Sequence, residues 1–297
     1  MPIPTATPAP TTLPRPFRVI GYATEAIIVE VIPFDKLTHI NYAFLLPNAD
    51  GSLAPLTNSW KITGLVNRAH QTGVQVLISV GGWGLDPQFE ELAANPSTRA
   101  RFIKATMEIV DQYGFDGVDI DWEYPDPGQS AQNYLALMRE LRAALTNKLL
   151  TTAVIAYGDE YGQGVPPECF ELLDFVNVMT YDGPDHASLG QFQQGLDYWL
   201  ARGVPPSKLV MGVPFYSRPG EVPFRKLADG KPDNAILDTL VYNGRDEHFN
   251  GLKLVEQKTE IALEKASGIM FWTLEQDAMG DLSLLNRIYQ TSAKTRP

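Results

Sequence analysis

Eight short apolar runs recur along the chain, and segments with helical spacing of apolar residues separate most of them. The runs are rich in β-branched and aromatic residues, which favour strands, and cover residues 17–23, 37–46, 74–82, 115–123, 149–157, 175–182, 209–217 and 268–274. Helical patterns occupy residues 62–73, 95–114, 130–148, 190–203, 250–268 and 281–290. Near-continuous apolar strands are typical of a parallel sheet that is covered on both faces. The pattern therefore predicts an α/β fold, a single (β/α)₈ TIM barrel rather than two doubly wound domains.

We expect this barrel to occupy residues 17–292 as one domain. Residues 1–16 are rich in Pro and Thr and offer little to bury, which predicts a linker or a disordered N-terminus. This segment lacks the apolar stretch of a signal peptide. Residues 218–249, between the seventh and eighth runs, contain turn signals throughout. We expect an elaborated loop there, without a full α+β insertion domain.

The composition excludes several classes of function. The chain has 35 acidic and 24 basic residues, a formal net charge of −11, which disfavours nucleic acid and anionic membranes as partners. The charge suits a neutral substrate, although it also promotes solubility. No apolar run approaches the roughly 18 residues of a membrane span. The single cysteine, Cys169, is expected to be a buried small hydrophobe, and the four histidines lack metal-ligand spacing. We expect no cofactor, no metal and a monomer.

The stretch DGVDIDWE at residues 116–123 places four carboxylates among strand-forming residues. Side chains alternate between the two faces of a strand. The apolar residues at even positions from 118 to 122 should therefore pack against helices. Asp119, Asp121 and Glu123 share the other face and should point into the barrel lumen. Glu123 would stand at the C-terminal end of the strand, where barrel active sites lie.

Like charges two residues apart on one buried face repel each other, and each buried ion is costly. At least one of the three carboxyl groups should therefore hold a proton with a raised pKa. Such a group at the mouth of a barrel is a candidate general acid. The alternative is an acidic ladder paired with basic residues, but the neighbouring strands hold little basic content apart from Arg218.

Aromatic residues stand at or near the ends of other runs: Tyr22, Phe44, Trp83, Tyr181, Tyr216 and Trp272. Each alone is more often a core residue than a ligand contact. Together they converge on the end of the barrel that carries Glu123. Aromatic rings around buried carboxylates suit sugar rings, which have apolar faces and hydroxyl edges.

Four motifs resemble those of glycoside hydrolase family 18, the chitinase family. Residues 116–123 fit its DxxDxDxE signature, SVGG at 79–82 its SxGG motif, VMTYD at 178–182 its MxYD motif, and FWTLEQD at 271–277 its ending with a tryptophan on the eighth strand. The resemblance spans about residues 17–290. Asp116 matches the signature with the opposite parity, so we expect a structural role for it.

The resemblance implies a retaining chitinase that hydrolyses β-1,4 bonds in chitin or chitooligosaccharides with the assistance of the substrate's N-acetyl group. Glu123 would be the general acid and base, Asp121 would orient the acetamido group, Asp119 would share a proton with Asp121, and Tyr181 would hydrogen-bond the acetamido oxygen. Substrate-binding positions implied by the resemblance are Trp272, Tyr22, Phe44, Trp83, Asp182, Tyr216, Arg218 and Met179. The resemblance also implies secretion, with an export signal that is not present in this chain.

The short segment at 218–249 departs from many family members, which carry a larger insertion there. A shallower and more open groove would favour endo-type or non-processive cleavage. Two alternatives stay open: an endo-β-N-acetylglucosaminidase acting on glycans or peptidoglycan, and a non-catalytic chitin-binding lectin on the same barrel. The presence of all four signature acids favours catalysis over the lectin.

Overall fold

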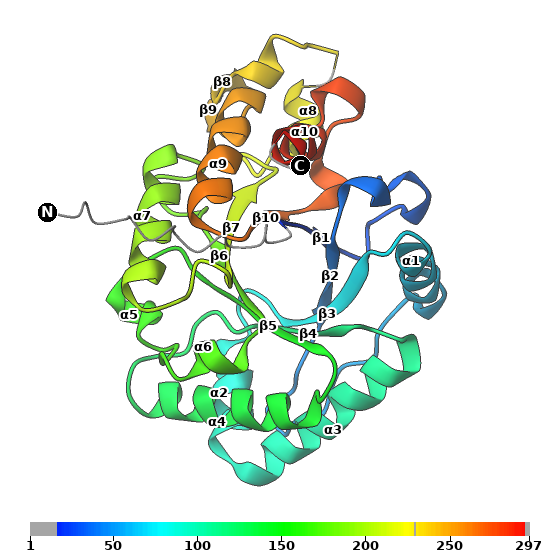
Figure 1. The fold of residues 1–297 in the computed structure, drawn as a ribbon, viewed down its shortest axis with the longest axis vertical. Helices are drawn as coiled ribbons and strands as arrows, with labels where there is room; N and C mark the ends of the chain where they lie inside the picture. Colours follow the sequence, from blue (N-terminus) through cyan, green and yellow to red (C-terminus); the bar gives the residue numbers. More distant parts are fainter. Residues whose placement is uncertain (1–16, 229, 295–297) are drawn as a thin grey trace, which may run out of the picture.

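The computed structural model describes residues 17–228 and 230–294, and its centre is a closed barrel of eight parallel strands in the order β1-β10-β7-β6-β5-β4-β3-β2 (Figure 1). These strands are β1 Arg18–Ala23, β2 His39–Leu45, β3 Gln75–Gly81, β4 Gly117–Asp121, β5 Leu149–Ile155, β6 Phe175–Met179, β7 Leu209–Pro214 and β10 Gly268–Trp272. Each lies within one predicted run, so the predicted barrel is confirmed. The prediction for residues 1–16 lies outside the described residues.

Helices surround the barrel (Figure 1). The longer ones are α1 Ser59–Gln71, α2 Asp86–Ala94, α3 Pro96–Tyr113, α4 Gln129–Ala144, α7 Leu189–Ala201, α9 Leu252–Lys265 and α10 Leu284–Ala293. The short ones are α5 Asp159–Gly162, α6 Cys169–Leu172 and α8 Phe224–Ala228, with 3₁₀ turns η1 Val29–Val31, η2 Phe34–Lys36, η3 Asn234–Ile236, η4 Leu274–Gln276 and η5 Gly280–Leu282. None of the helices in the described ranges combines the length and the apolar character that a membrane crossing requires.

Helix α2 was not predicted, because it is short and runs directly into the N-cap of α3. Asn95 ends α2 in an extended conformation, and its side chain accepts a hydrogen bond from the backbone of Ser97 at 2.9 Å. This is a normal N-cap interaction. Helix α3 then continues to Gly114, whose φ of 71° gives the left-handed ending that favours glycine.

The segment at 218–249 is more ordered than the predicted loop. It contains α8, η3 and an antiparallel hairpin of β8 Thr239–Tyr242 and β9 Arg245–His248. Asn243 and Gly244 form the two-residue turn, with φ of 50° and 77°. Asn-Gly flanked by strand-forming residues is a strong hairpin signal, so the sequence did carry the information. As predicted, no large insertion domain interrupts the described barrel.

The alternation predicted for β4 places its apolar side chains on one face and its buried carboxylates on the other. Val118, Ile120 and Trp122 belong to the main core between the strands and the helices. The Trp122 indole donates a hydrogen bond to Asp86 at the start of α2, at 2.7 Å, and so faces away from the lumen. A second, smaller cluster includes Ile20 and Met270 from adjacent strands and fills the lumen.

Candidate active site

Asp119 lies at the centre of the lumen, where it is completely buried. One carboxylate oxygen accepts hydrogen bonds from the hydroxyls of Tyr22 at 2.8 Å and Ser79 at 2.9 Å. The other accepts from Thr151 at 2.6 Å and from the Asn177 amide at 3.1 Å. Burial raises the pKa of Asp119, and these four hydrogen bonds oppose that shift. Asp119 therefore links β4 to β1, β3, β5 and β6.

Asp121, two residues further along β4 and on the same face, has a different environment. It is 3% exposed, and its Oδ1 has no hydrogen-bond partner among the residues that the structure describes. Burial, followed by the nearby charges of Glu123 and Asp119, raises the pKa of Asp121 well above its usual range. A carboxyl group in this position is stabilised in its protonated form.

Glu123 follows β4 at the C-terminal end of the barrel, and its side chain is partly buried. Burial raises its pKa to about 7; contact with the Tyr124 hydroxyl opposes this shift, and the charge of Asp182 adds to it. A carboxyl group with this pKa can both donate and accept a proton near neutral pH.

The aromatic residues around these acids form a platform. Trp272, at the end of β10, stacks on Phe44 with ring centroids 5.4 Å apart and planes 21° apart. Tyr22 packs against the same indole at 5.6 Å. Trp272 and Phe44 also line a cleft of about 570 Å³, which continues to the loops around Glu25 and Thr57. An apolar surface of this kind can support one face of a sugar ring.

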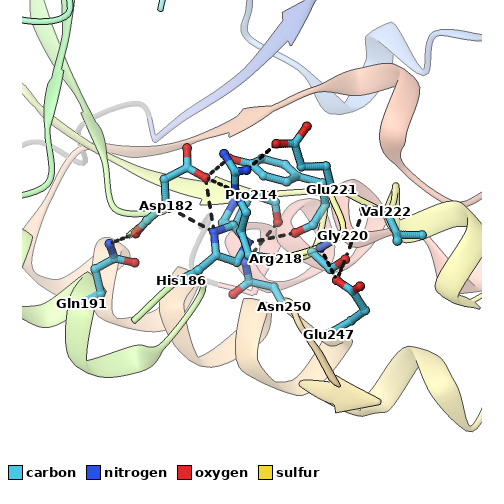
Figure 2. A network of polar contacts seen from close by, with 12 residues as sticks. Asp182, His186, Gln191, Pro214, Arg218, Gly220, Glu221, Val222, Glu247 and Asn250 are labelled. Carbon is cyan, nitrogen blue, oxygen red and sulfur yellow. Dashed lines mark hydrogen bonds and ion pairs between the residues drawn. The ribbon is translucent and has the colours of Figure 1, made fainter. Parts of the chain in front are cut away.

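Asp182 and its neighbours form the other side of the site (Figure 2). Its Oδ1 accepts hydrogen bonds from the Tyr216 hydroxyl and from Arg218 Nε, both at 2.8 Å. Burial raises the pKa of Asp182, but the hydrogen bonds from Arg218 and Tyr216 and the charge of Arg218 outweigh it and lower the pKa below its usual range. Arg218 also pairs with Glu221. Asp182 is therefore an anion throughout the range in which Glu123 titrates.

Tyr181 and Met179 come from the same end of β6 and belong to the lumen cluster. The Tyr181 ring packs edge-on against Tyr216 at 6.4 Å, and its hydroxyl lies 3.9 Å from the sulfur of Met270. Burial raises the pKa of Tyr181 well above its usual range. Its hydroxyl is therefore a hydrogen-bond donor at neutral pH.

Two of the predicted residues lie apart from this cluster. Trp83 is 81% exposed and has no ring contact with the described aromatic residues. Asp116 accepts hydrogen bonds from the backbone of Val76 at 2.7 Å and from His70 at 2.8 Å. These bonds tie the start of β4 to β3 and α1, which agrees with the structural role expected for Asp116.

Several residues that contact the site were not predicted from the sequence, namely Tyr124, Thr151, Asn177 and His186. Two of them could be found from strand register, because Asp119 pairs with Thr151 on β5 and Asn177 shares the parity of Met179 on β6. His186 lies in a loop, and no strand periodicity indicates it.

No group of three or more His, Cys, Asp or Glu residues in the described ranges is arranged to hold a metal ion.

Comparisons with known proteins agree with this geometry. The family model "Glycosyl hydrolases family 18" matches residues 18–277. A probable endochitinase of Caenorhabditis elegans is 33% identical over 61% of this chain and 36% of its own length. Chitinase 1 of Aphanocladium album is 26% identical over 70% of this chain and 62% of its own length. The chain thus spans about a third to two thirds of these two relatives.

Among solved structures, the GH18 chitinase ChiB from the chitin utilization locus of Flavobacterium johnsoniae is similar over nearly the whole chain. The two share a TM-score of 0.82 and 28% sequence identity, over 94% of this chain and 95% of the other. The similarity therefore covers most of the barrel.

Proposed function

This chain belongs to glycosyl hydrolase family 18, and we propose that it is a chitinase acting on β-1,4 bonds between N-acetylglucosamine units of chitin and chitooligosaccharides. The observation that carries the proposal is Glu123, whose pKa of about 7 places an exchangeable proton at the barrel mouth. It lies two residues after the buried Asp121, which itself lies two residues after the buried Asp119. The chitinases among its relatives support the choice of substrate.

In the first step, Glu123 donates its proton to the glycosidic oxygen while the acetamido oxygen of the substrate attacks the anomeric carbon. The bond to the leaving sugar breaks, and an oxazolinium intermediate forms. In the second step, the Glu123 carboxylate accepts a proton from water, whose oxygen attacks the same carbon and reopens the ring. Two inversions give net retention of configuration.

Three further residues stabilise this sequence in our proposal. Asp121 orients the acetamido group and stabilises the positive charge of the intermediate, which fits a buried carboxyl group with an unsatisfied oxygen. Asp119, which precedes Asp121 on the same face of β4, shares its proton. The Tyr181 hydroxyl donates to the acetamido oxygen. The Trp272 indole supports the sugar, because its stacking on Phe44 fixes the ring plane.

Secretion is also part of the proposal, since its polymeric substrate is too large to enter cells. We further propose that the protein acts as a monomer, because the acids and the aromatic platform described above all come from one chain.

The test compares wild type with Glu123→Gln on chitin oligosaccharides. The amide keeps the shape of the side chain but cannot donate and recover the proton, so kcat should fall by at least about 100-fold. Proton NMR of the first product should show the β-anomer. An inactive wild type, a fully active variant or an initial α-anomer would each contradict the proposed reaction.

A further inference from the structure

Asp182, His186 and Tyr216 form a closed ring of three hydrogen bonds. The Asp182 amide donates to His186 Nδ1 at 3.0 Å, and the Tyr216 hydroxyl donates to Asp182 Oδ1 at 2.8 Å. His186 Nε2 lies 3.1 Å from the Tyr216 carbonyl oxygen. A backbone amide can only donate and a carbonyl can only accept. His186 is therefore neutral here, with its single proton on Nε2.

This ring of hydrogen bonds joins the segments that follow β6 and β7 at the site. His186 is 5% exposed, lies in the loop between β6 and α7, and packs its imidazole against the Tyr216 ring at 5.1 Å. Figure 2 shows it beside Asp182, with Gln191 on the other side donating to the Asp182 carbonyl at 2.7 Å. Asp182 has a φ of 63°, a left-handed conformation that a non-glycine residue rarely adopts. Hydrogen bonds from both sides hold its backbone in that conformation.

The far end of the same loop is fixed as well. The buried side-chain nitrogen of Lys258 donates to the carbonyl of Ala187 and to the side chain of Asn250, both at 2.7 Å. Asn250 in turn donates to the carbonyl of Pro214 on β7 at 3.1 Å. The loop therefore has little freedom to move away from β7, and the position of Asp182 depends on the side chain that fills the space between them.

The position of Asp182 matters for Glu123. Asp182 is an anion, and its charge raises the pKa of Glu123. The other groups that act on Glu123 or on its partner Asp121 are Asp119, Tyr124 and Tyr181, and none of these contacts His186. On the side of Asp182, the charged neighbours are Arg218 and, through it, Glu221.

We propose that His186 is a positioning residue that holds Asp182 against Tyr216 and so sets the pH range over which Glu123 serves as general acid. This inference rests on the proposed glycosidase function. When His186 is lost, Asp182 can turn toward solvent with Arg218. Its charge then acts less on Glu123, which gives up its proton at lower pH.

The experiment measures kcat/KM against pH on a chitooligosaccharide for wild type, His186→Phe and His186→Gln. Phe keeps the ring volume but breaks both hydrogen bonds, so the alkaline limb of the profile should move to lower pH by about half a unit or more. Gln can accept from the Asp182 amide and donate to the Tyr216 carbonyl, so its profile should lie closer to wild type. His39→Phe is the matched control. His39 is also buried, but it lies at the N-terminal end of β2, away from the site at the C-terminal ends of the strands.

The His39→Phe control should lower the melting temperature without moving the alkaline limb of the kcat/KM profile. A folded His186→Phe protein with the wild-type limb would overturn the proposal. If that variant does not fold, His186→Asn replaces it: it retains an acceptor for the Asp182 amide but does not reach the Tyr216 carbonyl, and an unchanged limb would again overturn the proposal.

A second measurement does not depend on activity. Long-range ¹⁵N–¹H NMR of the wild type at pH 7 should show His186 as the neutral Nε2–H tautomer, whereas an Nδ1–H tautomer would exclude the ring of hydrogen bonds. An inactive wild type with the expected tautomer would refute the proposed reaction but not the geometry. An active wild type with the other tautomer would refute the inference alone.

Discussion

At the scale of single residues, Asp119 shows how one buried carboxylate can organise a site. Its four hydrogen bonds come from side chains on four strands, including Tyr22 on β1 and Asn177 on β6. Hydrogen bonds to a buried charge are stronger than those between neutral groups. They hold Asp119 in a fixed position beneath Asp121, whose own oxygen is left without a partner for the substrate to use.

Asp119→Asn should therefore weaken both folding and catalysis. The new amide cannot accept from all four donors, and an unsatisfied buried donor costs about 1–3 kcal/mol in the free energy of unfolding. Misplacement of Asp121 should lower kcat by about tenfold or more. Urea denaturation and steady-state kinetics measure the two effects. Asp116→Asn, directly before the same strand and outside the lumen, should change stability without a comparable loss of kcat.

Glu123 should make the folded protein less stable as the pH rises. Its pKa is raised from 4.5 to about 7 on folding, so the folded state holds this proton more tightly than the unfolded chain. The stability that the bound proton provides is present below pH 4.5 and is lost between pH 4.5 and 7. At pH 8, Glu123→Gln should be more stable than wild type by about 1–3 kcal/mol. Thermal denaturation of both proteins between pH 4 and 8 measures this; a constant difference would contradict the assigned pKa.

At the scale of elements, the β8–β9 hairpin braces the segment that carries Arg218. The backbones of Arg218 and His248 exchange hydrogen bonds at 3.0 and 2.8 Å. The buried Glu247 accepts from the Ser217 hydroxyl at 2.7 Å and from the Gly220 amide at 2.8 Å (Figure 2). The hairpin therefore fixes the path of the chain on both sides of the guanidinium that holds Asp182.

Glu247→Ala should loosen this segment. The two donors lose their acceptor, which should cost about 1–3 kcal/mol of stability, and kcat/KM should fall by about tenfold as Arg218 moves. Asp246→Ala is the control, because Asp246 is exposed on the same strand. Equal kinetic effects of the two substitutions would show that Glu247 has no special role.

How much of the fold and the site could be predicted from the sequence depended on whether a residue lies in an element with a regular alternation of side chains. The eight strands follow from runs such as residues 74–82, and Asp119, Asp121 and Glu123 follow from alternation on one strand. The partners of Asp119 required the register between strands, which the order of residues along one strand does not contain. The ring through His186 arises from a loop whose conformation depends on Lys258 and Asn250, both about 65 residues or more away in the sequence.

At the scale of the whole molecule, the groove is the main determinant of how a polymer can bind. Before α9, the described residues between 218 and 249 hold only short elements and no large domain beside the site. A site without a large domain beside it would allow a chain to bind along its length rather than only from its end. We therefore predict endo-type cleavage. The viscosity of soluble chitosan should fall well before reducing ends accumulate, and stepwise release of dimers from one chain end would contradict this prediction.

The pairing of β1 with β10, which closes the barrel, also affects how the chain folds during translation. Tyr22 and Trp272, whose rings lie 5.6 Å apart, are translated at opposite ends of the chain. At roughly 5–20 residues per second, about 12–50 s separate their synthesis. During this time the edge of β1 lacks its final partner and is open to pairing with other chains. Nascent copies of this protein should therefore depend on chaperones until the last strand emerges from the ribosome.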